Sequence, residues 1–432
     1  MQAMLSFEKA PPLAAPLRFF LTAPLYIVLA GLLIAYEGPA LFTSRWMPGT
    51  LAVTHLLTIG FMLQIMLGAL IQILPVVAGA NLARPLGVAK VVHPGLSAGA
   101  LLLAAGFLFA QPDLLCAAAL LLGLSVLFYL AASWWALLSV PSTSPTIRGL
   151  KFAWLGLAVV VSLGILLALG LARGWPLPLV ALTNLHAGWG LGAWAGVLLA
   201  SISYVVVPMF QLTSGYPARP SWWFPAVMLG LLLLWSVAVV ADWPGLVRLT
   251  QGLAAVAGIG FAGLTLRLQL QRRRARSDAT HRYWQLGLLS SIVALSLLLI
   301  AALWPAAAEL DGWPLFVGIL LIVGGFIAFI IGMLYKIVPF LTWMHLQSRG
   351  QAKVPAPAMN KILGDRDMQR QMYAYVAACA LLLAAVVLPE WLARPAGLAF
   401  ALAGGWLWWN LLGAARRYRQ HLGVIAAKLA TP

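Results

Sequence analysis

The chain has 432 residues, 63% of them hydrophobic and only 9% charged, and its mean hydropathy is +0.96. A soluble domain is typically about half apolar and a quarter charged, so this composition excludes an ordinary soluble globular protein. The two cysteines form no CxxC pattern, which argues against a thiolate metal site or a redox-active cysteine pair. The composition predicts a polytopic membrane protein.

The positive charge is distributed unevenly along the chain. With the N-terminus inside, only four of the 27 Lys and Arg fall outside the predicted cytoplasmic segments: Arg45, Arg173, Arg248 and Arg394. This bias follows the positive-inside rule, so we expect a bacterial inner-membrane protein with both termini in the cytoplasm. The net charge of +17 then reflects anchoring at anionic headgroups, for example by the cluster Arg272–Arg276, and not nucleic-acid binding.

Apolar stretches long enough to cross a bilayer occur twelve times, since about 20 residues span its core of roughly 30 Å. They lie at about residues 18–36, 50–76, 94–110, 114–138, 151–171, 180–208, 222–241, 244–265, 284–304, 314–340, 372–389 and 395–414. No polar stretch between them is long enough for a soluble domain. The sequence therefore predicts an all-α integral membrane protein of about twelve transmembrane helices in a lipid bilayer.

A short motif recurs near the ends of predicted spans 2, 6 and 10. Each copy has a small residue seven positions before a proline: Gly68 and Pro75, Ser201 and Pro208, Gly332 and Pro339. The three prolines are nearly evenly spaced, at intervals of almost a third of the chain, and a fixed period indicates internal repeats. We expect one membrane domain, 1–432, whose repeats at about 15–140, 148–266 and 283–414 form three pseudo-threefold four-helix arcs.

The motif is interpreted as architectural. Proline interrupts helical hydrogen bonding, so we expect it to close the cytoplasmic ends of spans 2, 6 and 10. The small residue two turns earlier lets a neighbouring backbone come close, as small residues do in membrane bundles.

Two of these three spans carry a histidine near their other end. His55 and His186 precede Pro75 and Pro208 by nearly equal distances, whereas the third span has Val317–Ile319 in that stretch. Ionisable residues inside membranes are rare and usually functional. Two imidazoles that converge at one depth suit axial ligation of a haem, or two of the ligands of a copper ion. The alternative is that each neutral histidine only hydrogen-bonds a neighbouring carbonyl group.

The remaining histidines lie at predicted cytoplasmic helix ends beside basic residues: His93, His281, His345 and His421. We expect these side chains to be solvated or to face lipid headgroups. Lys336 precedes Pro339 by three residues, and we expect its ammonium group to snorkel to the same interface.

The residues that follow the two histidines suggest room for a ligand. Gly60 and Gly68 leave space for the edge of a flat macrocycle, and the alternating glycines after His186 open one wall of that helix. Close helix packing is the other explanation for these glycines. Met62 and Met66 share a helical face and are candidate soft metal ligands beside the histidines, although methionines at this spacing usually pack in a core.

These features resemble the catalytic subunit of haem–copper oxidases and nitric oxide reductases, which also has twelve spans in three arcs. The helix His55–Pro75 is similar to the second span of nitric oxide reductase-type subunits, whose histidine ligates a low-spin haem b. The stretch His186–Pro208 looks like a histidine-bearing span of the same superfamily.

The departures from this superfamily decide which chemistry remains. Its binuclear centre needs three copper-binding histidines, including an adjacent pair, and its tenth span supplies two haem ligands. The present chain has six histidines in total, no adjacent pair, and none within Trp313–Pro339. Its spans also lack the carboxylates of a proton channel, so a proton-pumping oxidase is excluded. The closer resemblance is to NnrS-type membrane proteins, twelve-span relatives associated with nitric oxide metabolism and with haem binding.

The resemblance implies a haem b protein with His55 and His186 as ligands, acting in electron transfer, nitric oxide handling or metalloenzyme support with a redox or metalloenzyme partner. Copper, with Met62 and Met66 as further ligands, is the alternative cofactor. Two other classes remain open. One is a transporter or permease, including one for copper, that uses the same histidines. The other is a cofactor-free partner subunit whose histidines are only hydrogen-bonded.

Overall fold

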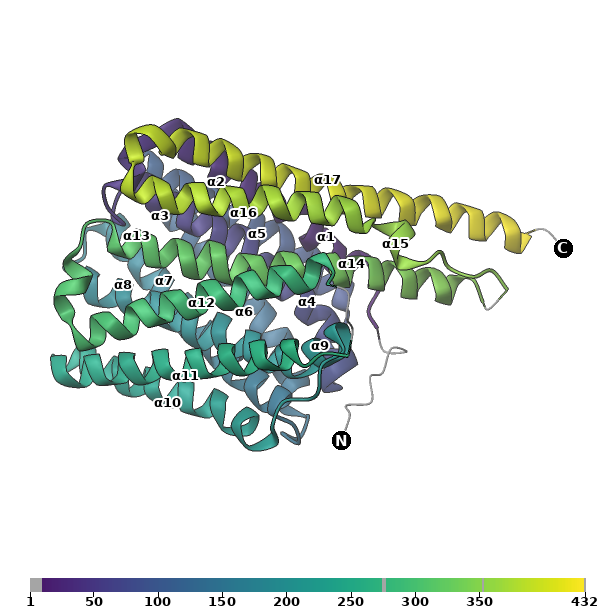
Figure 1. The fold of residues 1–432 in the computed structure, drawn as a ribbon, viewed down its shortest axis with the longest axis horizontal. Helices are drawn as coiled ribbons and strands as arrows, with labels where there is room; N and C mark the ends of the chain where they lie inside the picture. The colour runs from purple at the N-terminus through teal and green to yellow at the C-terminus, as the bar shows by residue number, and fades with distance from the viewer. Residues whose placement is uncertain (1–9, 274–276, 352, 431–432) are drawn as a thin grey trace.

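The computed structural model describes residues 10–273, 277–351 and 353–430, and this part of the chain contains helices and no strands (Figure 1). Residues 274–276 of the basic cluster discussed above lie outside these ranges. The helices are α1 (Ala14–Thr22), α2 (Pro24–Glu37), η2 (Gly38–Phe42), α3 (Pro48–His55), η3 (Leu56–Leu63), α4 (Gln64–Ile73), η4 (Leu74–Ala78), α5 (Pro85–Leu108), α6 (Pro112–Leu138), α7 (Pro145–Arg173), α8 (Leu179–Gly188), η5 (Trp189–Gly196), α9 (Val197–Gln211), α10 (Ala218–Val240), α11 (Pro244–Leu270), α12 (Ala279–Leu303), η6 (Pro305–Glu309), α13 (Trp313–Gly318), η7 (Ile319–Ile327), α14 (Ala328–Arg349), α15 (Met359–Ile362), α16 (Asp365–Val387) and α17 (Pro389–Ala430).

Twelve helices within the described ranges are long and apolar enough to cross a membrane, which confirms the predicted number of spans. Spans 2, 6 and 10 are each built from several consecutive helical segments, from α3 to η4, α8 to α9 and α13 to α14. Proline begins many of the helices, for example α3, α5, α6 and α7. Proline is favoured in the first helical turn because the amide group that it lacks has no partner there.

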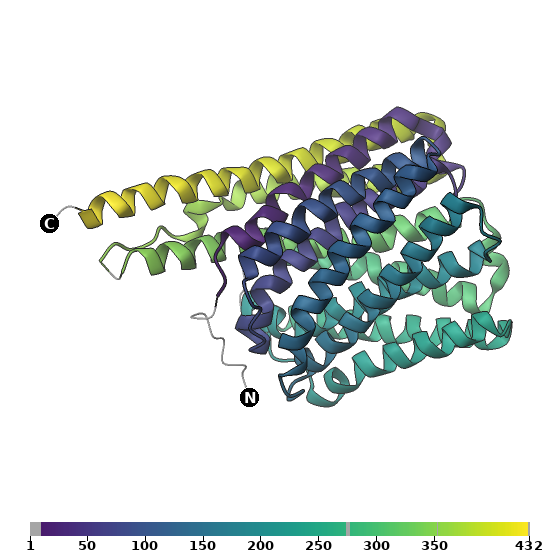
Figure 2. The same ribbon diagram turned by 180° about the vertical axis from the view of Figure 1, so that it is seen from behind.

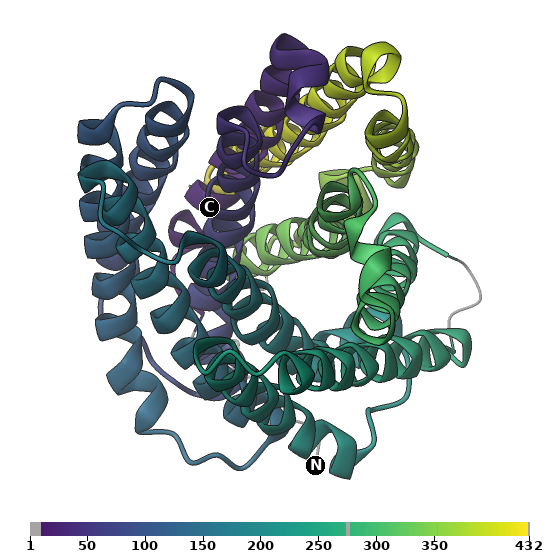
Figure 3. The same cartoon turned by 90° about the vertical axis from the view of Figure 1, so that its left-hand side faces the viewer.

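The first and last spans lie side by side, so the two ends of the chain meet within the bundle (Figure 3). Helix α2 packs against α17, and Gly31 and Gly397 lie where the two backbones touch. A Cβ atom on Gly31 would overlap the backbone of Ala401, and one on Gly397 would overlap that of Ala35. Glycine is required at this crossing because no side chain fits between the helices.

The small residues of the repeated motif make the contacts expected of them. A Cβ atom on Gly68 would lie 2.8 Å from Cβ of Phe19, and one on Gly332 would lie 2.8 Å from Cβ of Tyr283. Ser201 in turn faces Gly149, where an added Cβ would overlap the serine hydroxyl group. In each repeat the small residue therefore lets the preceding spans pack closely: span 1 against span 2, span 5 against span 6, and span 9 against span 10. This confirms the packing role predicted for the small residues.

A second feature recurs with the motif, and the sequence did not predict it. Spans 2, 6 and 10 each contain a π-helical segment: η3, η5 and η7. All three segments end at the same distance before the repeated proline, at Leu63, Gly196 and Ile327. A π-helix is rare and often marks a functional position. Its threefold recurrence supports the internal repeats, while their arrangement in three arcs stays a prediction.

The expectation that proline closes each of these spans is wrong for the third. Pro75 lies in η4 at the end of its span and Pro208 lies three residues before the end of α9. Pro339, by contrast, lies inside α14, which continues to Arg349. The extra turns are stabilised outside the bundle, where the hydroxyl group of Tyr418 on α17 lies 2.8 Å from Nδ1 of His345.

The C-terminal half of α17 extends well beyond the other helices, next to the end of α14 (Figures 1 and 2). Helix α17 has 42 residues and is therefore about 63 Å long. A bilayer including its headgroups is only about 40–45 Å thick. This arm lies at the end of the bundle that the charge distribution predicts to be cytoplasmic, and His55 and His186 lie toward the opposite end.

Candidate functional site

A cavity of about 1260 Å³ lies within the bundle, and we call it the histidine cavity because His55 and His186 both line it. It extends from the two histidines to α11, α12 and α13. Its lining is mainly aliphatic and aromatic. Ligand cavities commonly measure about 300–1,000 Å³, so this one has room for a large cofactor.

The predicted pair of histidines meets in this cavity. The ring centroids of His55 and His186 are 6.3 Å apart and their planes differ by 26°. His55 is the last residue of α3, directly before the π-helical segment of span 2, and His186 lies three residues before the π-helical segment of span 6. The two equivalent spans therefore bring their imidazoles together at one depth, as the repeat predicts.

The hydrogen bonds of both rings define their tautomers. Nδ1 of His55 lies 2.7 Å from the carbonyl oxygen of Leu51, one turn earlier on the same helix. Nδ1 of His186 lies 3.0 Å from the carbonyl oxygen of Val160 on α7. A carbonyl oxygen only accepts, so Nδ1 carries the proton in each neutral ring and Nε2 keeps its lone pair. Most metal-binding histidines are oriented in this way, by a hydrogen bond from the other ring nitrogen.

Two residues that shape the pair were missed at the sequence level. Gly164 lies one turn after Val160 on α7, and a Cβ atom there would be 3.0 Å from Cε1 of His186. The same face of α7 thus supplies both the acceptor for His186 and the space for its ring. Phe107 of α5 lies beside the other ring, with its centroid 5.3 Å from that of His55. Neither residue carries a local sequence signal, because each is defined by a contact between different spans.

The two groups of glycines predicted to accommodate a macrocycle differ in outcome. A Cβ atom on Gly60 would overlap the ring of Tyr26, and Gly68 faces Phe19, so side chains of the first span fill both spaces. The predicted role of Gly60 and Gly68 is therefore wrong, and helix packing explains these two positions. The glycines after His186, by contrast, line the histidine cavity, so that face of the helix is open as predicted: Gly188, Gly190, Gly192 and Gly196.

Met62 and Met66 both line the histidine cavity on the part of span 2 that follows His55. Thr54 and Thr58 line it too, and each hydroxyl group donates to the carbonyl oxygen four residues earlier at 2.8 Å. The side chain of Met62 is buried in the core. Within the described ranges, no three His, Cys, Asp or Glu side chains form a group that could hold a metal ion. A metal bound here would therefore depend on the two histidines, with the methionines as candidate soft donors.

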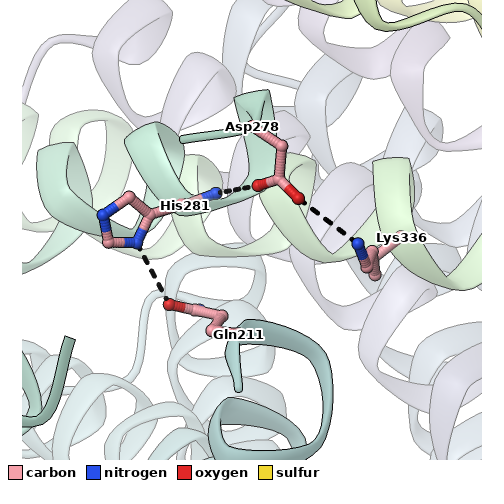
Figure 4. Close-up of polar contacts among 4 residues, drawn as sticks. All are labelled: Gln211, Asp278, His281 and Lys336. Atoms are coloured by element: carbon pink, nitrogen blue, oxygen red, sulfur yellow. Dashed lines mark hydrogen bonds and ion pairs between the residues drawn. The ribbon is translucent and has the colours of Figure 1, made fainter. Parts of the chain in front are cut away.

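His281, one of the four remaining histidines, is not solvated as predicted. It is buried near the opposite end of the bundle, in a group that we call the inner polar cluster: Gln211, Asp278, His281 and Lys336 (Figure 4). Nδ1 of His281 donates to Oε1 of Gln211 at 3.4 Å, and Asp278 accepts the backbone N–H of His281 at 2.9 Å. The expectation of a solvated side chain is wrong, because the side chain is buried and its ring contacts Gln211, the last residue of α9.

Lys336, which was expected to extend to the membrane interface, forms an ion pair. Its Nζ lies 3.3 Å from Oδ2 of Asp278, which also caps the first turn of α12 (Figure 4). Both side chains are partly exposed, at 22% and 17%. This ion pair connects span 10 to the start of span 9. The sequence pointed only to the lysine, because Asp278 is distant from it along the chain.

The sequence was also compared with known proteins. It matches no protein-family model, and no curated protein matches it significantly.

Proposed function

We propose that this protein is a membrane-bound haem b protein in which His55 and His186 are the two axial ligands, and that it acts in electron transfer. The observation that carries the proposal is the geometry of the pair. Two imidazoles with protonated, carbonyl-bonded Nδ1 atoms and unprotonated Nε2 atoms line one large apolar cavity.

The separation of the rings fits this assignment. A metal–nitrogen bond of about 2 Å and roughly 1 Å from each nitrogen to its ring centre give about 6 Å between two imidazoles on opposite sides of one metal. The observed distance between centroids is 6.3 Å. This distance also lies within the range of about 4.5–7 Å found for ordinary aromatic pairs, so the tautomers and the cavity carry the assignment.

Each residue has a definite part in such a site. Leu51 and Val160 fix the ring orientations through their carbonyl oxygens, and Gly164 leaves space for His186. The apolar lining excludes water, which favours a hydrophobic macrocycle and influences its potential. A haem with two axial imidazoles supplies one-electron chemistry and has no open iron position for a substrate. This is why electron transfer is favoured over chemistry on a bound gas.

The proposed setting follows from the resemblance to NnrS-type proteins and to the haem–copper oxidase superfamily. On that basis the protein belongs to the bacterial inner membrane and exchanges electrons with a redox or metalloenzyme partner in nitric oxide metabolism or metalloenzyme support. The arm formed by α17 at the predicted cytoplasmic end offers a surface for such a partner.

The test is a dithionite-reduced minus oxidised visible spectrum of the detergent-purified protein, with quantification of haem per chain. We expect a sharp α-band and about one haem per chain, and loss of both in the double variant His55→Ala/His186→Ala. Full retention of haem in that variant would contradict the assignment of the ligands.

Copper binding is the second candidate, and the position of Met62 and Met66 on the lining of the same cavity favours it. Thioether and imidazole donors together suit copper, particularly Cu(I). The copper candidate includes a copper transporter, in which the histidine cavity would be a binding site along the transport path. Metal analysis of the same preparation separates the candidates: stoichiometric copper without a haem spectrum would replace the haem proposal.

A further inference from the structure

The charged residues of the histidine cavity all have the same sign. Among the described residues, its lining contains two arginines, Arg45 and Arg248, and no Asp, Glu or Lys. Both belong to the four basic residues on the side of the bundle where the positive-inside rule predicts few. An apolar cavity with cations at one end is suited to an amphipathic ligand that carries negative charge at one edge.

Arg45 is held at the histidines by neutral partners. Its Nη1 donates to Oδ1 of Asn184 at 3.0 Å, and Asn184 precedes His186 by two residues on α8. Its guanidinium carbon lies 4.8 Å from the centroid of the Trp46 ring, in a cation–π contact. The guanidinium group is thus positioned at the part of the cavity that the histidine pair lines.

The positive charge of Arg45 is not neutralised by the protein. Throughout residues 10–273, 277–351 and 353–430, no carboxylate lies within ion-pairing distance of its guanidinium group. The side chain is half-buried, and this burial lowers the pKa of Arg45 from its ordinary value. A guanidinium group has five N–H donors, and the contact with Asn184 uses one of them. A partly desolvated cation with free donors is stabilised by an anionic group of a ligand.

We propose that the guanidinium group of Arg45, held in place by Asn184 and Trp46, binds a carboxylate of the macrocycle whose metal the histidine pair ligates. This inference rests on the proposed haem function and adds to it the orientation of the ligand. A haem carries its two carboxylates on one edge. Arg45 would hold that edge, and the aliphatic side chains of the cavity would surround the apolar edges.

Arg394 shows that an arginine at this end of the bundle need not be a ligand-binding residue. Its Nη1 donates to the carbonyl oxygens of Ala35 and Tyr36, at 3.0 and 3.1 Å, and it does not line the cavity. Its donors are thus used to hold the end of α2. Arg45, in contrast, faces the cavity with donors to spare.

The experiment compares two probes, haemin and haemin dimethyl ester, in which both carboxylates are neutral. Each is titrated into the purified full-length apoprotein in detergent, and the Soret absorbance gives its affinity. We expect the wild-type protein to bind haemin about 10- to 100-fold more tightly than the ester, since one charged hydrogen bond has an effect of this size. Arg45→Gln should lose this preference by weakening the binding of haemin alone.

Two further variants keep the result interpretable. Arg45→Lys retains the charge but not the planar group of donors, so it should keep part of the preference. Arg173→Gln removes an exposed arginine at the end of α7 that does not line the cavity, and it should behave as the wild type.

The possible outcomes distinguish this inference from the function on which it rests. Equal affinity of the wild type for both probes would overturn the role of Arg45 and leave the haem proposal intact. An equal loss of both affinities in Arg45→Gln would do the same, because it would show a structural role only. Failure of both probes to bind at all would overturn the proposed function itself.

Discussion

His186 and His281 are both histidines whose Nδ1 atoms contact an amide oxygen inside the bundle, yet their surroundings differ completely. His186 donates to Val160 and lines a cavity of about 1260 Å³, to whose lining the described part of the chain contributes no carboxylate. His281 donates to Gln211 beside the ion pair of Asp278 and Lys336, and it lines no part of that cavity (Figure 4). The hydrogen-bonded tautomer is therefore a shared feature. The space next to the ring is what indicates a ligand site.

Replacing each of these histidines by alanine tests the comparison most strongly. We expect His186→Ala to lower haem affinity by about 100-fold, because one axial bond and its orienting contact are both lost. His281→Ala should leave haem content and the reduced spectrum unchanged. Haem per chain after purification, and the position of the α-band, measure both effects. Equal loss of haem in the two variants would show that a histidine lining the histidine cavity contributes no more to haem binding than one outside it.

A smaller effect is expected when the wall behind His186 is altered. A Cβ atom on Gly164 would lie 3.0 Å from Cε1 of His186, so Gly164→Val should push the ring away from the carbonyl oxygen of Val160. We expect haem affinity to fall about tenfold, the usual effect of losing an orienting partner of a metal ligand. The control is Gly230→Val on α10, where no atom lies within 4 Å of an added Cβ. Similar affinities of the two variants would refute the orienting role of α7.

The same contrast explains what the sequence revealed and what it did not. The twelve spans follow from hydropathy, and His55 and His186 follow from their equivalent distances to a repeated proline. Gly164 and the carbonyl group of Val160 complete the site from α7, and no periodicity relates them to the histidines. Residues of one helix are linked by a local pattern, whereas contacts between spans depend on packing.

The wrong predictions have the same origin. Gly60 was expected to face a macrocycle, but the ring of Tyr26 on another span occupies its open side. His281 was expected in solvent or at the headgroups, but it is buried and contacts Gln211 at the end of α9. Proline was expected to end α14 at Pro339, but packing against α17 continues the helix to Arg349. In each case a tertiary contact overrides a correct local tendency.

The inner polar cluster should affect stability and not ligand binding. Lys336→Met removes one partner of the ion pair, and Asp278→Asn removes its charge while keeping a side chain that caps α12 well. Because both groups are partly exposed, we expect each change to lower the free energy of unfolding by only about 1–2 kcal/mol. Thermal unfolding of the two variants and of the double variant gives their coupling energy. Complete additivity, or any change in haem affinity, would contradict the assigned role.

The smallest effect is expected at the methionines, and it sharpens what the histidine cavity holds. If the histidine pair ligates a haem, both axial positions are filled, and Met62→Leu/Met66→Leu exchanges side chains of similar volume in the lining. Haem affinity should then change by less than about threefold. If the site holds copper, the same double variant removes the candidate soft donors beside the two imidazoles, and bound copper should fall sharply. Haem affinity should therefore stay nearly constant, whereas bound copper should fall. Because this double variant has little effect on the fold, it separates the two candidate cofactors of the histidine pair.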